Sequence, residues 1–378
     1  MASTHKDPVL VVLELTGAND YLNTIVPYSN PLYWDNRPKV NIAEDQLLVI
    51  DHELAFRSDT EPLKDIYDNG NMAIIHGIGF DNSPRSHFRA MDIWHTCEPD
   101  SIGIDGWLGK VIRDLDPGGE NVLKGVNLGQ GLPRALTMRG VPVTSVNHLP
   151  SYGVLSSNPG ITSEHERDQL LESFARMYAP AIGTGPTMEY LGQAGRDALR
   201  GADIIRVAPE SYSSNVEYAD NPIARRLRDV AQVHLAGLGT QVFYTSHGPF
   251  DTHFDQGGSH TKIWMEVSAA ISDFFVDLRE HDAADNVVMM VFSEFGRRVR
   301  DNGTGTDHGA AGVAFAIGDR VNGGMYGTYP SLKPENLTQG DLAPNYDFRG
   351  FYSTLTDKWL GLDPVPIVGG NFEQMSFV

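Results

Sequence analysis

One stretch of the chain is dense in side chains that bind metals. Residues His247–Asp255 hold two histidines and two aspartates in nine residues. Imidazole and carboxylate are the ligands that zinc, manganese or iron take in proteins. Asp251 and His253 are two positions apart, which puts both side chains on one side of an extended segment. We therefore predict that they hold a divalent metal, and a purely structural group is the alternative.

A second stretch runs from Glu294 and Arg297 through a glycine-rich loop to Asp307 and His308. An adjacent Asp-His pair bounded by glycines lets two side chains approach the same ion, so both residues are candidate metal ligands. Glu294 is a candidate ligand or a group that orients one, and Arg297 a candidate to neutralise an anion. The alternative is an ordinary loop with a capping aspartate.

Two earlier segments add a possible nucleophile and a further carboxylate. Ser86 stands where a helix is expected to begin, and free N–H groups at a helix start favour an anion and an activated oxygen. The fork of Arg85 suits a phosphate or a sulfate. Serine is also an ordinary N-cap, and Ser83 competes as the nucleophile. Asp20 is a metal ligand or part of an Asn-Asp turn.

Each of these segments follows a short apolar run that reads as a strand. Near-continuous apolar runs rich in β-branched residues are typical of parallel strands covered on both faces. The four main runs are Pro8–Leu15, Met72–Ile78, Gln241–Thr245 and Asn286–Phe292, with Val141–Val146 and Val313–Ile317 as weaker candidates.

Helical patterns alternate with these runs. Ser86–Thr96 begins with a good N-cap residue. Apolar positions recur at spacings of three and four in Pro222–Leu238 and Thr261–Glu280, and Ser163–Tyr178 reads as a surface helix. The alternation predicts an α/β fold, a three-layer αβα sandwich with a mostly parallel, doubly wound sheet. Ligands bind such sheets outside the carboxyl ends of the strands, where the polar segments lie.

No linker interrupts the sequence, so we expect a single domain over residues 1–378. The segment at about 147–220 has weaker periodicity and is predicted to be a helical cap or insertion.

The bulk composition excludes several classes of partner. The formal charge of −20 over 378 residues disfavours nucleic acid. No apolar run reaches the ~18 residues that span a membrane. A single cysteine, Cys97, rules out an internal disulfide.

The motif segments resemble the domain-of-unknown-function family 1501. The matching pieces are Leu15–Tyr28, Ser83–Phe88, Phe250–Gln256, Phe292–Arg297, Gly305–Gly309 and Asp347–Arg349. That family is similar to the alkaline phosphatase and sulfatase superfamily, which implies an alkaline-phosphatase-like fold. Members of the family often resemble exported proteins with a leader. This implies a periplasmic or secreted protein, or a cytoplasmic one if the given N-terminus is native.

The superfamily resemblance also implies roles for particular residues. Asp20 matches its metal-binding Asp after the first strand, and Ser86 matches the nucleophile at a helix start. The superfamily's adjacent Asp-His ends a strand, whereas here Glu294 takes that place and the pair follows 13 residues later. Phosphatases of the superfamily also use a histidine late in the chain, and this sequence has none after His308. His247 or His87 is the candidate to take the place of that histidine.

The leading hypothesis is a metal-dependent hydrolase of phosphate or sulfate esters. It would use Ser86 as nucleophile and Arg85 and Arg297 on the substrate anion, with a small-molecule or sugar ester as substrate. One or two divalent ions (zinc, manganese or calcium) would be held by Asp20, Asp251, His253, Asp307 and His308. The alternative is a non-catalytic metal- or ligand-binding protein on the same fold. A serine esterase is disfavoured because no G-x-S-x-G elbow is present.

Overall fold

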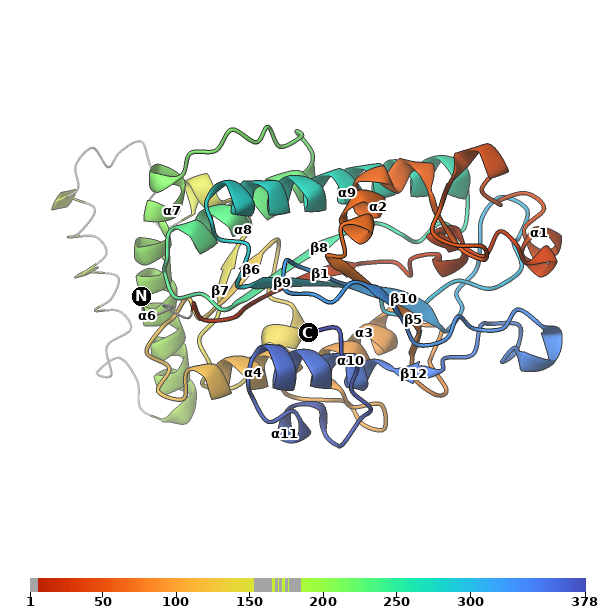
Figure 1. Ribbon diagram of the computed structural model, residues 1–378. Coiled ribbons are helices and arrows are strands. Elements are labelled where there is room, and N and C mark those ends of the chain that lie inside the picture. Colours follow the sequence, from red (N-terminus) through yellow and green to blue (C-terminus); the bar gives the residue numbers. More distant parts are fainter. Residues whose placement is uncertain (1–5, 153–164, 167–168, 170–171, 174–175, 177–184) are drawn as a thin grey trace.

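The structure is a computed structural model that describes residues 6–152, 165–166, 169, 172–173, 176 and 185–378. The described chain builds a nine-stranded sheet with helices on both faces (Figure 1). The predicted α/β sandwich with a mostly parallel sheet is confirmed.

The order of the strands brings the four predicted apolar runs into one sheet. Along the sheet the strands are β11 (Gly324–Tyr326), β5 (Met72–Gly79), β10 (Gly312–Ile317), β9 (Val287–Phe292), β1 (Val9–Leu15), β8 (Val242–His247), β6 (Gly125–Leu128) and β7 (Thr144–Val146), with β12 (Tyr346–Asp347) beside β5. β1 lies at the centre, parallel to both β8 and β9. β6 was not predicted, because four residues that include the polar Asn127 give too short an apolar signal.

β10 is the one strand of this described sheet that runs against the others. It pairs antiparallel with β9 on one side and with β5 on the other. The residues that precede β10 therefore lie at the same edge as the carboxyl ends of β1, β5, β8 and β9. This explains how Asp307 and His308 reach that edge although they do not follow a strand.

Side chains of β1 alternate between two hydrophobic cores, as the pleat of a strand requires. Val11 and Leu13 pack into one core and Leu10 and Val12 into the other, and all four are fully buried. The first core is covered by α2 (Glu61–Asp68), α8 (Pro222–Leu235) and α9 (Gln256–Glu280), and the second by α3 (His87–Thr96), α4 (Trp107–Leu115), α10 (Phe348–Thr354) and α11 (Val365–Val368). Both faces of the sheet are thus buried, which is why its strands read as continuous apolar runs.

Two predicted helix boundaries are wrong. α9 begins at Gln256, five residues before the predicted start, because Gly257 and Gly258 weaken the helical signal in its first turn. α8 ends at Leu235, before the left-handed Gly237, rather than at Leu238. α3 runs over His87–Thr96 with Ser86 as its N-cap, as predicted.

Smaller elements complete the fold. A three-stranded antiparallel sheet joins β2 (Ile25–Val26), β4 (Ala55–Arg57) and β3 (Leu47–Val49), next to the short helix α1 (Pro31–Asn36). Among the described residues, no helix combines the length and the apolar character that crossing a bilayer needs.

The predicted cap at about 147–220 is described only in part. The helix predicted at Ser163–Tyr178 lies largely outside the described residues. The described portion contains α6 (Pro186–Ile205) and α7 (Val207–Ser211). α6 packs against the amino end of β7, where Gly201 approaches Thr144. This part of the segment therefore lies away from the carboxyl edge of the sheet.

Candidate metal centre

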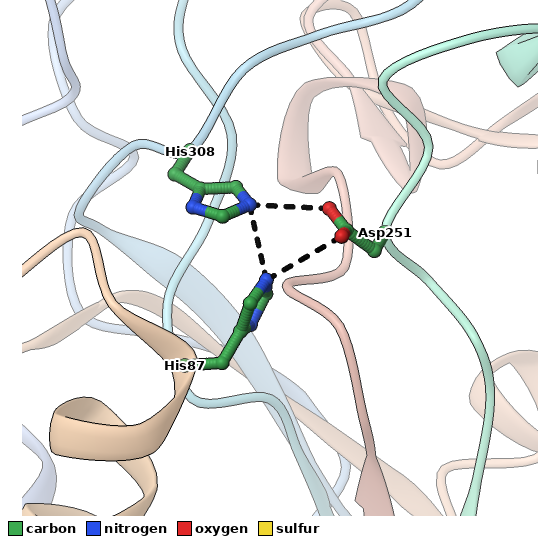
Figure 2. A group of neighbouring side chains, drawn as sticks. All are labelled: His87, Asp251 and His308. Carbon is green, nitrogen blue, oxygen red and sulfur yellow. Dashed lines mark hydrogen bonds and ion pairs between the residues drawn. The ribbon is translucent and has the colours of Figure 1, made fainter.

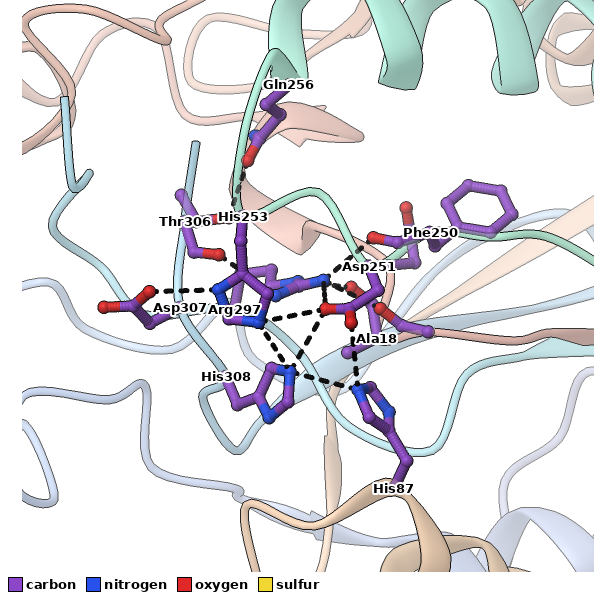
Figure 3. A network of polar contacts seen from close by, with 12 residues as sticks. Ala18, His87, Phe250, Asp251, His253, Gln256, Arg297, Thr306, Asp307 and His308 are labelled. Atoms are coloured by element: carbon purple, nitrogen blue, oxygen red, sulfur yellow. Dashed lines mark hydrogen bonds and ion pairs between the residues drawn. The ribbon is translucent and has the colours of Figure 1, made fainter. Parts of the chain in front are cut away.

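Side chains from two loops and from the start of α3 meet at the carboxyl edge of the sheet. Figure 2 shows His87, Asp251 and His308 pointing at one another, and His253 joins them in Figure 3. The Nε2 atom of His308 lies 3.0 Å from His87 Nε2, 2.9 Å from His253 Nε2 and 3.1 Å from Asp251 Oδ1. His253 Nε2 is also 3.1 Å from Asp251 Oδ1. We call these four residues the His3Asp cluster.

The other ring nitrogen of each histidine is held by an acceptor. His87 Nδ1 donates to Glu294 Oε1 at 2.7 Å. His253 Nδ1 donates to Asp307 Oδ1, and His308 Nδ1 donates to the carbonyl oxygen of Arg85, both at 3.0 Å. A carboxylate or a carbonyl can only accept, so each Nδ1 carries the hydrogen. In the neutral rings, the three Nε2 lone pairs therefore face the centre of the cluster.

This donor set fits a metal ion. Three imidazole lone pairs and a carboxylate oxygen are all acceptors, so they cannot satisfy one another by hydrogen bonds. Four-coordinate zinc takes such a set with bonds of about 2.0–2.1 Å, which separates neighbouring ligand atoms by roughly 3.3 Å. Four observed separations, of 2.9–3.1 Å, are slightly shorter, and His87 Nε2 lies 3.6 Å from Asp251 Oδ2. An Nδ1–H donated to a carboxylate or a carbonyl is also the usual support of a metal-binding histidine.

Glu294 and Arg297 anchor the loops around the cluster rather than entering it. Glu294 is 1% exposed and accepts the backbone N–H groups of Gly17 and Ala18 as well as His87. The guanidinium of Arg297 is buried and donates to Asp251 Oδ1 at 2.7 Å. Its other contacts are the carbonyl oxygens of Gly17, Ala18, Phe250 and Thr306 (Figure 3). Arg297 therefore fixes Asp251 and ties the loops together.

These contacts determine the protonation states of the Glu294 and Asp251 carboxyl groups. Burial raises the pKa of Glu294, but hydrogen bonds from His87, Ser293 and Ala18 outweigh it and hold that pKa below its usual value. Likewise, burial raises the pKa of Asp251, but the hydrogen bond and the charge of Arg297 outweigh it and lower that pKa. The hydrogen bond to Glu294 in turn raises the pKa of His87. Both carboxyl groups are thus ionised near neutral pH.

Close backbone contacts set the position of the two late ligands. His308 forms an isolated antiparallel bridge with Arg297, and Arg298 N–H donates to the Asp307 carbonyl at 2.9 Å. A side chain at Gly305 would meet the carbonyl oxygen of Thr252 at 2.2 Å. Glycine at 305 is therefore required for this loop to lie against the segment that carries Asp251 and His253.

The cluster is open to solvent. The side chains of His87, Asp251 and His253 are 29%, 38% and 43% exposed. A small substrate could therefore reach the four converging groups directly.

Asp20 is near this site but is not brought into the His3Asp cluster. Its side chain is fully buried, and its two oxygens accept from Arg37 NH1 at 2.6 Å and NH2 at 3.0 Å. Gln256 Nε2 donates to the same carboxylate. Although burial raises the pKa of Asp20, the Arg37 charge outweighs it and lowers that pKa. The structure therefore gives Asp20 a partner other than a metal.

The predicted nucleophile and its neighbour have different surroundings. Ser86 is exposed and precedes His87 as the N-cap of α3, yet its side chain forms no capping hydrogen bond. The Arg85 guanidinium forms an ion pair with Asp341 Oδ2 at 2.6 Å. The hydroxyl of Ser83 is buried and has no hydrogen-bond partner within the part of the chain that the structure describes.

The structure thus brings together Asp251, His253 and His308 directly, with Asp307, Glu294 and Arg297 around them. The sequence reasoning placed His87 only among possible substitutes. Its signal was its position, directly after Ser86 at the start of a helix that follows a strand end. His247, the other substitute, lies outside the cluster, with Nε2 at 3.4 Å from Glu266.

Three solved structures to which the chain is similar share about a tenth of its sequence. A periplasmic domain of EptC from Escherichia coli, solved in complex with Zn, is 10% identical over 99% of this chain and 89% of that chain, with a TM-score of 0.43. A protein of the alkaline phosphatase superfamily from Vibrio parahaemolyticus is 10% identical over 97% and 70%, with a TM-score of 0.40. A 2-O GAG sulfatase is 10% identical over 98% and 76%, with a TM-score of 0.38.

At the level of sequence, no curated protein matches the chain. Residues 182–364 match the family described as Protein of unknown function (DUF1501). The matched region contains Asp251, His253, Asp307 and His308, and it ends beyond α10. Over this region, the chain is similar to the DUF1501 family.

Proposed function

We propose that the protein is a metal-dependent hydrolase of phosphate or sulfate esters, with Ser86 as its nucleophile. The observation that carries the proposal is the convergence of three histidine Nε2 atoms on the Asp251 carboxylate. The cluster is solvent-accessible and lies at the carboxyl edge of the sheet, the usual ligand site of such folds.

The types of ligand atom in the His3Asp cluster indicate which metal ion it would bind. His87, His253 and His308 would supply nitrogen ligands and Asp251 an oxygen. Imidazole-rich sites suit zinc and other transition metals, whereas calcium takes oxygen ligands alone. The proposal therefore favours zinc or manganese, and a single ion, because the carboxylate of Asp20 is paired with Arg37. A bound ion of this kind would stabilise negative charge on a transferring group and favour the ionised form of a nearby hydroxyl.

The start of α3 supplies the remaining groups. The first backbone N–H groups of a helix have no partner inside it, and no side chain caps α3. Together with the positive end of the helix dipole, they suit the non-bridging oxygens of a phosphate or sulfate. The hydroxyl of Ser86 at the same helix end, free of a capping bond, is available to attack the ester.

The proposal is tested by metal analysis combined with turnover of chromogenic phosphate and sulfate esters. We expect the purified protein to hold about one ion and to lose activity on chelation. A Ser86→Ala variant is expected to keep its metal while kcat falls at least ~100-fold, as removal of a nucleophile demands. A Ser83→Ala variant is the matched control and is expected to retain activity. Metal binding without turnover of any ester would instead favour a non-catalytic metal-binding protein.

An Asp307→Asn variant is expected to bind its metal about tenfold more weakly, because Asp307 fixes the ring of His253. Loss of such an orienting carboxylate costs about 10- to 100-fold in metal affinity. The side chain is 54% exposed, so the substitution should leave the fold intact. The affinity is measured by competition with a chromogenic chelator. Asp285→Asn, also exposed but paired with Lys6, is the control, and an equal loss in both variants would contradict the assigned role.

A further inference from the structure

A pocket of about 420 Å³ adjoins the His3Asp cluster and shares Asp251 with it. Its walls come from the end of β8, the segment after it and one face of α9. Ser259, Lys262 and Glu266 follow one another on α9 at spacings of three and four, so they share that face. Phe254, the residue after His253, lines the pocket and is 75% exposed. Anything held at the cluster by its ester group would have this space beside it.

Two buried polar side chains of the pocket wall each have an atom that forms no hydrogen bond with the described residues. His247 is 6% exposed and Thr252 is 3% exposed. Neither His247 Nε2 nor Thr252 Oγ1 forms a hydrogen bond within the described residues. Glu266 Oε2 lies 3.4 Å from that nitrogen. Buried polar atoms are nearly always paired, so two unpaired ones in one wall indicate a place where a ligand completes the hydrogen bonding.

The charged and polar groups that line the pocket indicate which kind of ligand it can bind. Its charged groups are one cation, Lys262, and two carboxylates, Asp251 and Glu266. This balance disfavours a second anionic group on the substrate, as does the charge of −20 on the whole chain. Carboxylate, ammonium and hydroxyl groups together serve a ligand that both donates and accepts hydrogen bonds. The exposed ring of Phe254 adds a flat apolar surface.

We propose that this pocket binds the organic part of the ester, and that this part is a neutral, hydroxyl-rich ring such as a sugar. Glu266 accepts hydrogen bonds from its hydroxyl groups, Lys262 donates to them, and Phe254 packs on the ring face. This inference rests on the proposed function, because it places the ester group at the His3Asp cluster.

The test is isothermal titration calorimetry of the metal-loaded Ser86→Ala protein, which is expected to hold esters without turnover. The probes are glucose 6-phosphate, galactose 6-phosphate and their 6-sulfates, compared with inorganic phosphate and sulfate. We expect at least one sugar ester to bind ten times more tightly than the corresponding inorganic anion. Glu266→Gln and Phe254→Ala are each expected to remove most of that advantage, while the affinity for the inorganic anion and the metal content stay unchanged.

Matched controls separate this pocket from its surroundings. Met265→Ala alters the exposed neighbour of Glu266 on α9, and Phe88→Ala removes the exposed phenylalanine that follows His87; neither residue lines the pocket. Both are expected to leave binding unchanged. Lys262→Met provides a second pocket variant on an exposed side chain, should Glu266→Gln lower the melting temperature.

The possible failures are distinguishable. Absence of metal, or of binding by either inorganic anion, would count against the proposed function itself. If metal and anion bind normally but no sugar ester gains affinity, the pocket does not recognise such a ring. The same conclusion follows if Phe88→Ala costs as much affinity as Phe254→Ala.

Discussion

A His308→Ala variant is expected to lose its bound metal and, with it, ester hydrolysis. His308 Nε2 lies within 3.1 Å of the other three ligand atoms of the cluster, so it is the shared neighbour of all of them. Loss of a group that only orients a ligand costs about 10- to 100-fold in metal affinity, so loss of the ligand itself should exceed ~100-fold. Elemental analysis of the purified protein and turnover of a chromogenic ester measure the two effects.

His52→Ala is the matched control for this experiment. The His52 side chain is 89% exposed, and its ion-pair contact is a loose 3.9 Å approach to Glu53. This variant should keep both metal and activity. Added metal should also raise the melting temperature of the metal-free wild type and of His52→Ala, because an ion that binds only the folded state stabilises it. An unchanged metal content in His308→Ala would show that the ion binds elsewhere.

The central strands could be predicted because strands that are buried on both faces have a continuous run of apolar residues. β1 is covered on both faces, so residues 9–15 are buried throughout, and only Glu14 interrupts the apolar run. β8 and β9 are its direct neighbours and read in the same way. The polar segments after these strands had to meet at one edge, since parallel strands end on the same side. The positions of Asp251 and His253 at this edge could therefore be predicted from their place after β8.

Other parts of the site depend on contacts that sequence spacing does not reveal. Asp307 and His308 precede a strand, and only the antiparallel direction of β10 places them beside His253. The orientation of each histidine ring depends on the acceptor that its Nδ1–H group contacts. For His308 this acceptor is a backbone carbonyl, and a sequence motif of side chains does not indicate such a contact. The pairing of Asp20 with Arg37 is equally invisible, since nothing in the residues around Arg37 marks it as a partner.

The pairing of Asp20 with Arg37 carries the largest expected effect on stability. An Asp20→Asn variant is expected to lose about 3–5 kcal/mol of unfolding free energy, because it leaves the Arg37 charge buried without its counter-ion. Both side chains are almost fully buried, at 1% and 0% exposure. Arg37 would keep the carbonyl oxygens of Val299 and Arg298 and a neutral amide oxygen as acceptors, but no negative charge. Urea unfolding measures the loss. The surface pair Lys64–Asp68, in which the Asp68 side chain is 54% exposed, provides the control, since Asp68→Asn should cost at most about 1 kcal/mol.

The same variant decides between the two roles of Asp20. If Asp20 serves as the counter-ion of Arg37, an Asp20→Asn, Arg37→Met double variant should be less destabilised than the sum of the single variants, because no unpaired charge remains. The folded fraction of Asp20→Asn should also retain its metal. If Asp20 were a ligand, as its place after the first strand predicted, metal would be lost while the unfolding free energy of the metal-free protein barely changed. Loss of stability with metal retained, and loss of metal with stability retained, are opposite outcomes, so a single substitution separates the two assignments.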